Sequence, residues 1–266
     1  YENYCKFSTY KSLLNLFIQL STSIDNLITL TKLYSDFTFV QANGGNISVK
    51  TDINNLYVIK SSGIKFSNMN NYNGYTIINN NKFIKNSVPS MEYKMHNYLK
   101  KYTIHLHPIY INRISIRNDA EHIFRKFFTE SLIIPYCNPG DDLALAINNK
   151  YDNQSIIFLL NHGVVFTDNN INNLINIITE TMSVIRNHEI NYNYNISPEI
   201  LYSGLMKDKY YICNDFIQNN LCYIATEKCV FPDFIVHTEK ISMISDKLVI
   251  NNDNYEFPFF NNVNNP

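Results

Sequence analysis

The chain has 266 residues, of which 45% are hydrophobic and 17% charged, a composition typical of a globular protein with a substantial buried core. Its net charge of -1 provides no basic excess to neutralise a phosphate backbone, so we expect no nucleic-acid partner, although a local site can still bind one small anion. The five scattered cysteines favour reduced thiols. No apolar run approaches the ~20 residues of a membrane helix, and no targeting segment is recognised. We therefore expect a cytoplasmic protein without a membrane partner.

The spacing of apolar residues predicts helices that alternate with short strands. Apolar positions three or four apart mark the helices, and short apolar runs bounded by Gly, Pro or Asn mark the strands. In the first half, the predicted elements are a helix over residues 10–34, strands over 47–50 and 56–60, a helix over 91–101 with Ser90 as its N-cap, and a strand over 103–107. In the second half, they are helices within 110–130, a strand over 132–135, a helix over 142–147, a strand over 155–160, a helix over 171–191, further helices after 198, and strands over 234–237 and 248–250. This alternation indicates an α/β protein, with one domain over residues 1–196 and a C-terminal extension over 197–266 that packs on it.

The strongest local signal for chemistry is the sequence His105-Leu106-His107 on a predicted strand. Side chains two positions apart on a strand point to the same face, with Cα atoms about 6.5 Å apart, so both imidazoles can meet at one metal ion. Taken alone, however, the pattern is more often part of an ordinary surface or core strand.

Three further residues are candidates that the sequence alone leaves open. His162 follows the apolar strand over 155–160, at the strand end where open α/β sheets place ligands, but it is also typical of an ordinary turn. Glu92 near the start of a predicted helix suits either capping through the helix dipole or a general base beside a metal. His96 lies four residues later on the same predicted helix face, where it either binds a metal with Glu92 or supports Glu92 by packing or a hydrogen bond.

Two glycine-containing turns are candidate anion sites. Gly44-Gly45-Asn46-Ile47-Ser48 and Ser61-Ser62-Gly63 offer backbone N–H groups and small hydroxyl side chains, and Ser90 at a predicted helix start is a third candidate. Each of these segments is also typical of an ordinary turn or cap. Because a predicted strand follows Gly44-Gly45 where a nucleotide-binding loop needs a helix, we exclude a dinucleotide fingerprint and a P-loop.

The order of the candidate segments is more informative than any one of them. Along residues 10–190 the chain contains, in order, Gly45-Asn46-Ile47-Ser48, Ser62-Gly63, Pro89-Ser90-Met91-Glu92, His105-Leu106-His107-Pro108, Pro135-Tyr136 and Asn161-His162-Gly163. This order resembles the class II aldolase/adducin family, in particular the fuculose-phosphate aldolases. Farther along, Phe231-Pro232-Asp233-Phe234 is similar to the branch related to rhamnulose-phosphate aldolases.

The resemblance implies a three-layer α/β/α fold with a central mixed sheet flanked by helices, and an enzyme that uses zinc. The implied site residues are the zinc ligands His105, His107 and His162, the acid/base Glu92, the proton donor Tyr136, which often reaches a neighbouring subunit's site, and the phosphate-binding residues Asn46, Ser62, Gly63 and Ser90. Related enzymes often have a second serine where this chain has Met91, so its phosphate site lacks one hydroxyl.

The implied reaction is reversible aldol cleavage of a phosphorylated ketose to dihydroxyacetone phosphate and an aldehyde, by a homotetramer whose partner is a small phosphorylated sugar. A pentulose-phosphate 4-epimerase and a methylthio-sugar-phosphate dehydratase of the same family share the zinc site. Glu92, where epimerases tend to have aspartate, favours the aldolase. The non-enzymatic alternative is an adducin-like scaffold, which resembles the family without its metal ligands.

Overall fold

The computed structural model describes residues 2–80, 82–84 and 87–191, together with short strands at 210–212, 240–244 and 247–251. Its α-helices are α1 (Glu2–Leu33), α2 (Ile109–Ser115), α3 (Ala120–Phe127), α4 (Asp141–Lys150) and α5 (Ile171–Asn191), and its 3-10 helices are η1 (Phe66–Asn68) and η2 (Tyr93–Tyr98). Its strands are β1 (Asn46–Lys50), β2 (Leu56–Lys60), β3 (Tyr75–Asn79), β4 (Lys82–Phe83), β5 (Tyr102–Leu106), β6 (Leu132–Ile134), β7 (Ile156–Leu159), β8 (Gly163–Asp168), β9 (Tyr210–Ile212), β10 (Lys240–Ile244) and β11 (Lys247–Asn251).

The central sheet has the strand order β4-β3-β2-β1-β5-β8-β7-β6. Neighbouring strands are antiparallel except β6 and β7, which are parallel, so the sheet is mixed. In its centre, β1 pairs with β5 so that Asn46 lies opposite His105, and β8 pairs with β5 so that Val165 lies opposite the same histidine. This register places three segments that are far apart in the sequence side by side.

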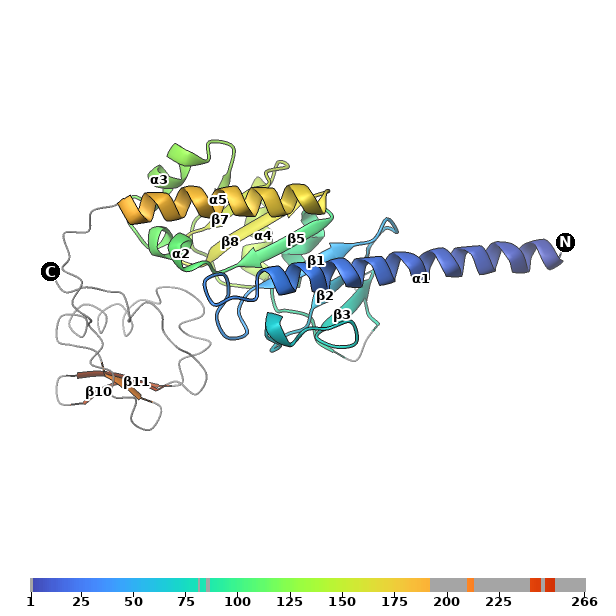
Figure 1. The fold of residues 1–266 in the computed structure, drawn as a ribbon, viewed down its shortest axis with the longest axis horizontal. Helices are drawn as coiled ribbons and strands as arrows, with labels where there is room; N and C mark the ends of the chain where they lie inside the picture. Colours follow the sequence, from blue (N-terminus) through green and yellow to red (C-terminus); the bar gives the residue numbers. More distant parts are fainter. Residues whose placement is uncertain are drawn as a thin grey trace.

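Helices cover both faces of the sheet (Figure 1). Each face of the sheet has its own apolar core, and alternate residues of β8 point into one or the other. Val164 and Phe166 belong to the cluster shared with α1 and α5, whereas Val165 belongs to the cluster shared with η2 and α4. The arrangement confirms the predicted three-layer α/β/α fold with a mixed sheet. By the same alternation, Ile104 and Leu106 of β5 face α1 and α5, so His105 faces the opposite side.

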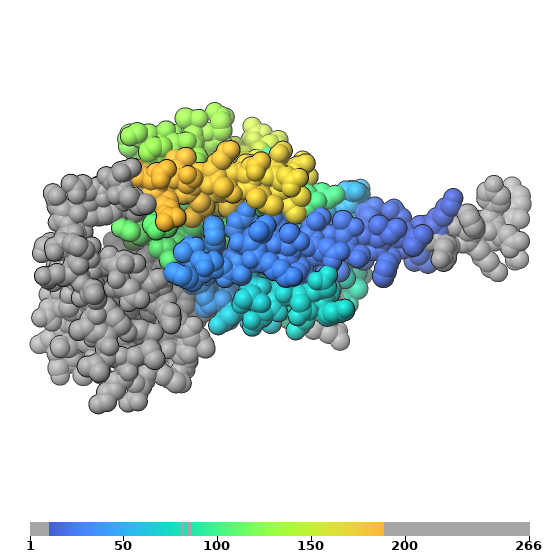
Figure 2. Space-filling model, in the orientation of Figure 1, coloured from blue at the N-terminus to red at the C-terminus, as the bar shows by residue number. Residues whose placement is uncertain are grey.

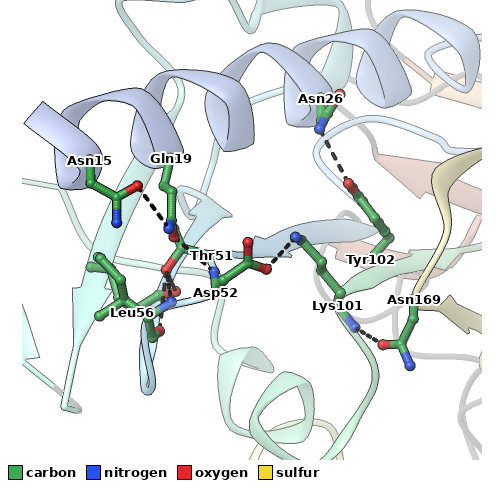
Figure 3. A network of polar contacts seen from close by, with 10 residues as sticks. Asn15, Gln19, Asn26, Thr51, Asp52, Leu56, Lys101, Tyr102 and Asn169 are labelled. Carbon is green, nitrogen blue, oxygen red and sulfur yellow. Dashed lines mark hydrogen bonds and ion pairs between the residues drawn. The ribbon is translucent and has the colours of Figure 1, made fainter.

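The long helix α1 is attached to the sheet by its C-terminal part. Leu27 and Leu30 are fully buried. Asn26 Nδ2 donates a hydrogen bond to the Tyr102 hydroxyl at 3.3 Å, and Gln19 Oε1 accepts one from a backbone N–H beyond β1 at 3.0 Å (Figure 3). The N-terminal part extends past the sheet (Figures 1 and 2) and exposes the large apolar side chains Leu13, Leu14, Phe17 and Ile18.

The stretch Lys11–Leu33 of α1 is long and apolar enough, by length and composition, to cross a membrane. Core helices of soluble proteins and signal sequences near an N-terminus have the same properties. Because Leu27 and Leu30 lie in the core shared with the sheet, the C-terminal part of this stretch has the burial of a core helix.

One prediction about local structure is wrong, and several strands were not predicted. The helix expected over 91–101 is instead the shorter 3-10 helix η2, which packs against the sheet with Met95 buried. A 3-10 helix rises about 2.0 Å per residue, so it covers a given length with fewer residues than an α-helix does. Strands β3, β4, β8, β9 and β10 were not predicted. Because β8 pairs with β7, the segment after β7 is the turn of a hairpin. The predicted helices after 198, the strand over 234–237 and the domain boundary after residue 196 lie outside the described residues, whereas β11 contains the strand predicted over 248–250.

Candidate functional site

Three histidines from two different parts of the sheet meet in one buried cluster. His105 lies on β5, His107 directly follows that strand, and His162 lies in the turn between β7 and β8. Because β8 pairs with β5, the turn is brought beside the His-Leu-His segment. His105 Nε2 lies 2.8 Å from His107 Nε2 and 3.2 Å from His162 Nε2, and none of the three residues is more than 4% exposed.

Gly163 permits this close approach. A Cβ at this position would lie 2.9 Å from His107 Cδ2 and 3.2 Å from His105 Cε1, and it would collide with the carbonyl oxygen of Leu106. The turn itself is made by Asn161, whose φ of 57° is a left-handed conformation that asparagine tolerates. The glycine of the Asn-His-Gly segment is therefore required by packing against the other two histidines.

The protonation of the cluster suits a divalent cation. His105 Nδ1 lies 3.0 Å from the carbonyl oxygen of Val164, to which it must donate, so Nε2 of the neutral ring carries the lone pair. Burial, followed by the charges of His107 and His162, holds the pKa of His105 well below its usual range. Imidazole nitrogens at Zn–N distances of ~2.0–2.1 Å in a tetrahedral site are about 3.3 Å apart. The three residues, whose ligand atoms lie within 4.8 Å of one another, thus fit a metal such as zinc.

The carboxylate of Glu92 faces the histidine cluster. Its Oε1 lies 3.3 Å from His162 Nε2, and its Oε2 lies 3.5 Å from His105 Nε2. Oε2 also accepts a hydrogen bond from Asn46 Nδ2 at 2.8 Å. Glu92 occupies the N-cap position of η2, but its side chain makes no capping hydrogen bond to that helix. The carboxylate instead lies where it can exchange a proton with a molecule bound beside the histidines.

The segments predicted to hold a phosphate lie next to one another. A backbone bridge joins the turn over residues 61–63 to the segment over 89–90. The Ser90 hydroxyl accepts a hydrogen bond from the Glu92 backbone N–H at 3.4 Å, which links this segment to the carboxylate. Gly63 has a φ of +73°, and a Cβ placed there would meet nothing within 4 Å, so open space adjoins the turn. These segments therefore adjoin one another, open space and the Glu92 backbone, as an anion site near the carboxylate requires.

Lys60 is a site residue that the sequence reasoning missed. Its side chain is 2% exposed, and its Nζ donates to the carbonyl oxygens of Asn43 at 3.1 Å and Ser61 at 3.4 Å. Burial lowers its pKa to about 8, partly opposed by the charge of Glu92. The available signal was a lysine that ends an apolar strand directly before the Ser-Ser-Gly turn. Its ammonium connects the two turns that were expected to bind an anion.

Two other candidates lie outside the cluster of three histidines. His96 is not one of the clustered histidines, because its ring nitrogens contact Asn46 and Ser48. It therefore supports Glu92 through Asn46. Tyr136, on the loop after β6, is 43% exposed, so within a single chain its side chain is accessible to solvent or to a second subunit.

The comparisons with known proteins agree with this geometry. The sequence profile of the Class II Aldolase and Adducin N-terminal domain matches residues 25–187, a range that contains every predicted site residue. The chain belongs to this family. A comparison with curated proteins gave no match.

Solved structures of the class II aldolase family share the fold. The N-terminal class II aldolase domain of a Thermoplasma acidophilum protein is 22% identical with a TM-score of 0.56, and the alignment covers 62% of this chain and 93% of that one. An L-fuculose 1-phosphate aldolase is 19% identical with a TM-score of 0.54, over 65% of this chain and 87% of that one. YgbL from Escherichia coli is 15% identical with a TM-score of 0.58, over 65% of this chain and 91% of that one. At these identities the similarity establishes the fold.

Proposed function

We propose that the protein is a zinc-dependent aldolase that reversibly cleaves a phosphorylated ketose to dihydroxyacetone phosphate and an aldehyde. The observation that carries the proposal is the convergence of His105, His107 and His162 with the carboxylate of Glu92 in one buried cluster. The three histidines would hold the metal through Nε2. A divalent cation bound there supplies Lewis-acid stabilisation of the negative charge that develops on the substrate oxygens.

Glu92 is the proposed acid/base. In the condensation direction its carboxylate removes a proton from the carbon beside the carbonyl group of dihydroxyacetone phosphate, and that carbon then attacks the aldehyde. Tyr136, presented to a neighbouring subunit, donates a proton to the alkoxide that results. Burial of Glu92 keeps bulk water away from the transferred proton, and the hydrogen bond from Asn46 holds the carboxylate beside the histidines. A positioned acid/base of this kind is typically worth about 10²–10⁴ in rate.

The substrate phosphate is proposed to bind where the turns meet. Asn46, Ser62, Gly63 and Ser90 would provide the amide, backbone N–H and hydroxyl donors, and Lys60 would add a positive charge. In support, the Lys60 ammonium already bonds to carbonyl oxygens of both turn regions, at 3.1 and 3.4 Å. An anion at this point would compensate a buried cation that otherwise has neutral hydrogen-bond partners there.

The family contains alternatives to the aldolase. A pentulose-phosphate 4-epimerase would use the same metal and similar bond chemistry, but Glu92 in place of aspartate favours the aldolase. An adducin-like scaffold has no need for three buried histidines and a carboxylate facing one another, so the cluster favours an enzyme.

The decisive experiment combines metal analysis with product analysis. We expect the purified protein to retain about one zinc ion per chain and to release dihydroxyacetone phosphate from a phosphorylated ketose, whereas an epimerase would return a sugar of unchanged carbon count. Replacement of His162 by alanine should remove zinc and activity together. The matched control is replacement of His122, an exposed histidine on α3, which should change neither. An active, zinc-loaded His162→Ala protein would refute the ligand assignment, and a wild-type protein without zinc would favour the scaffold.

We also propose a cytoplasmic homotetramer with sites at subunit boundaries. The exposure of Tyr136 supports a role across such a boundary. Light scattering of the purified protein measures the assembly directly, and a monomeric but active enzyme would exclude a Tyr136 contribution from a second subunit. The division into a domain over residues 1–196 and an extension over 197–266 stays a prediction.

A further inference from the structure

His96 is fully buried beside the proposed catalytic centre and is neither a proposed metal ligand, nor the acid/base, nor a phosphate-binding residue. It extends from η2 over β1, where Asn46 and Ser48 lie two positions apart and so share a face of the strand. Its Nδ1 lies 2.7 Å from Ser48 Oγ, and its Nε2 lies 2.5 Å from Asn46 Oδ1. Because Asn46 also bonds to Glu92, four side chains form one continuous hydrogen-bonded chain that ends at the carboxylate.

The donor and the acceptor of every hydrogen bond in this series follow from the carboxylate of Glu92 at its end. An ionised Glu92 carboxylate can only accept, so the atom of Asn46 that faces it must be the donor Nδ2, and the opposite atom must be the acceptor Oδ1. His96 Nε2 must then carry a proton in order to donate to Oδ1. Burial, followed by the charge of Lys50, lowers the pKa of His96 to about 3, so the ring is neutral and its Nδ1 carries no proton. Ser48 must therefore donate to Nδ1.

We infer that His96 is a positioning residue, which fixes the side-chain amide of Asn46 with its nitrogen toward Glu92. In the opposite orientation, the Asn46 oxygen would face a carboxylate oxygen at the 2.8 Å now occupied by a hydrogen bond, and two acceptors at that distance repel. His96 thus sets the direction in which Asn46 donates to the acid/base, without contacting Glu92 itself.

This inference rests on the proposed role of Glu92, but one test of it requires no activity. Nuclear magnetic resonance of the zinc-loaded protein labelled with ¹⁵N in its histidines distinguishes the two neutral tautomers and the charged ring. We expect His96 to be neutral and protonated at Nε2 across the range from pH 6 to 8. A ring protonated at Nδ1, or at both nitrogens, would overturn the inference whatever reaction the protein catalyses.

The second test asks whether His96 acts through Asn46. The probe is exchange of a carbon-bound proton of dihydroxyacetone phosphate for deuterium, which reports the proposed proton transfer by Glu92 in the absence of any aldehyde. We expect His96→Leu to lower the exchange rate by about 10- to 100-fold, and His96→Gln, which can place an amide N–H near the position of Nε2, to recover most of it. His122→Leu, at an exposed histidine, is the matched control and should leave exchange unchanged.

A double-mutant cycle separates positioning from a merely structural role. If His96 acts through Asn46, adding His96→Leu to an Asn46→Ala protein should change the exchange rate by less than about 3-fold. Equal losses in the two backgrounds would overturn the inference. A wild-type protein that binds zinc but exchanges no proton of dihydroxyacetone phosphate would refute the proposed function, and the tautomer measurement would then decide the inference about His96.

Discussion

Replacement of Lys60 by methionine tests whether the buried charge at the proposed phosphate site destabilises the folded protein. Methionine has a similar length and no charge, and it fills the space of a side chain that is 2% exposed. Because burial lowers the pKa of Lys60 from 10.5 to about 8, and each factor of ten in proton affinity corresponds to about 1.4 kcal/mol, the charged form costs about 3 kcal/mol at pH 7. The variant also leaves two carbonyl oxygens without this donor, at about 1 kcal/mol each. We therefore expect Lys60→Met to be about 1–2 kcal/mol more stable at pH 7.

The pH dependence of this difference has a definite sign. The pKa of Lys60 is lower in the folded protein than in the unfolded chain, so the native state binds fewer protons between pH 8 and 10.5. The free energy of unfolding of the wild type should therefore rise through this window relative to the variant, and the advantage of Lys60→Met should disappear by about pH 10.5. Urea denaturation of both proteins at pH 7, 9 and 10.5, in a chelating buffer, measures the difference. A variant that is less stable at pH 7, or a difference independent of pH, would refute the reasoning.

The same substitution should weaken the binding of inorganic phosphate to the zinc-loaded protein by about 10-fold or more, because a hydrogen bond to a charged group contributes about 1.5–3 kcal/mol. Lys50 offers a matched control, since burial also lowers its pKa to about 8, while its Nζ donates to the carbonyl oxygens of Asn97 and Leu99 at the end of η2. Isothermal titration calorimetry with phosphate should show normal affinity for Lys50→Met. Equal losses in the two variants would exclude a specific role for Lys60.

Three further substitutions test other parts of the structure. Gly163→Ala should abolish zinc retention, measured by metal analysis, because the added Cβ collides with the backbone and rings of the His105–His107 segment; normal zinc content would contradict the packing argument. Tyr136→Phe should reduce cleavage of the phosphorylated ketose by about 10²-fold or more while deuterium exchange into dihydroxyacetone phosphate continues, since the exchange requires Glu92 and the metal but not Tyr136. Phe124→Ala should lower the free energy of unfolding by about 3–5 kcal/mol, because it leaves a cavity against the stacked ring of Phe158. Urea denaturation measures the loss, and a value below about 1 kcal/mol would show that the core collapses around the cavity.

Much of the framework could be predicted without coordinates. Helix α1 and the β1–β2 hairpin follow from local periodicity, since an amphipathic helix repeats every 3.6 residues and a strand every two. The His105–His107 pair could be recognised for the same reason, because two positions on one strand must share a face. The order of the short segments then indicated the family.

What the sequence determined by itself was therefore the set of chemical groups and their local spacing: the histidines, one glutamate and the turns that surround them. Only the tertiary structure decided which of these groups meet. The pairing of Asn46 opposite His105, the hairpin that brings His162 beside them, and the burial of Lys60 all arise from contacts between segments distant in the chain. The direction of the hydrogen bonds through His96 depends on the same contacts, because burial removes the water that would otherwise satisfy either tautomer. Local periodicity carries no information about such pairings, which the packing of the whole sheet selects.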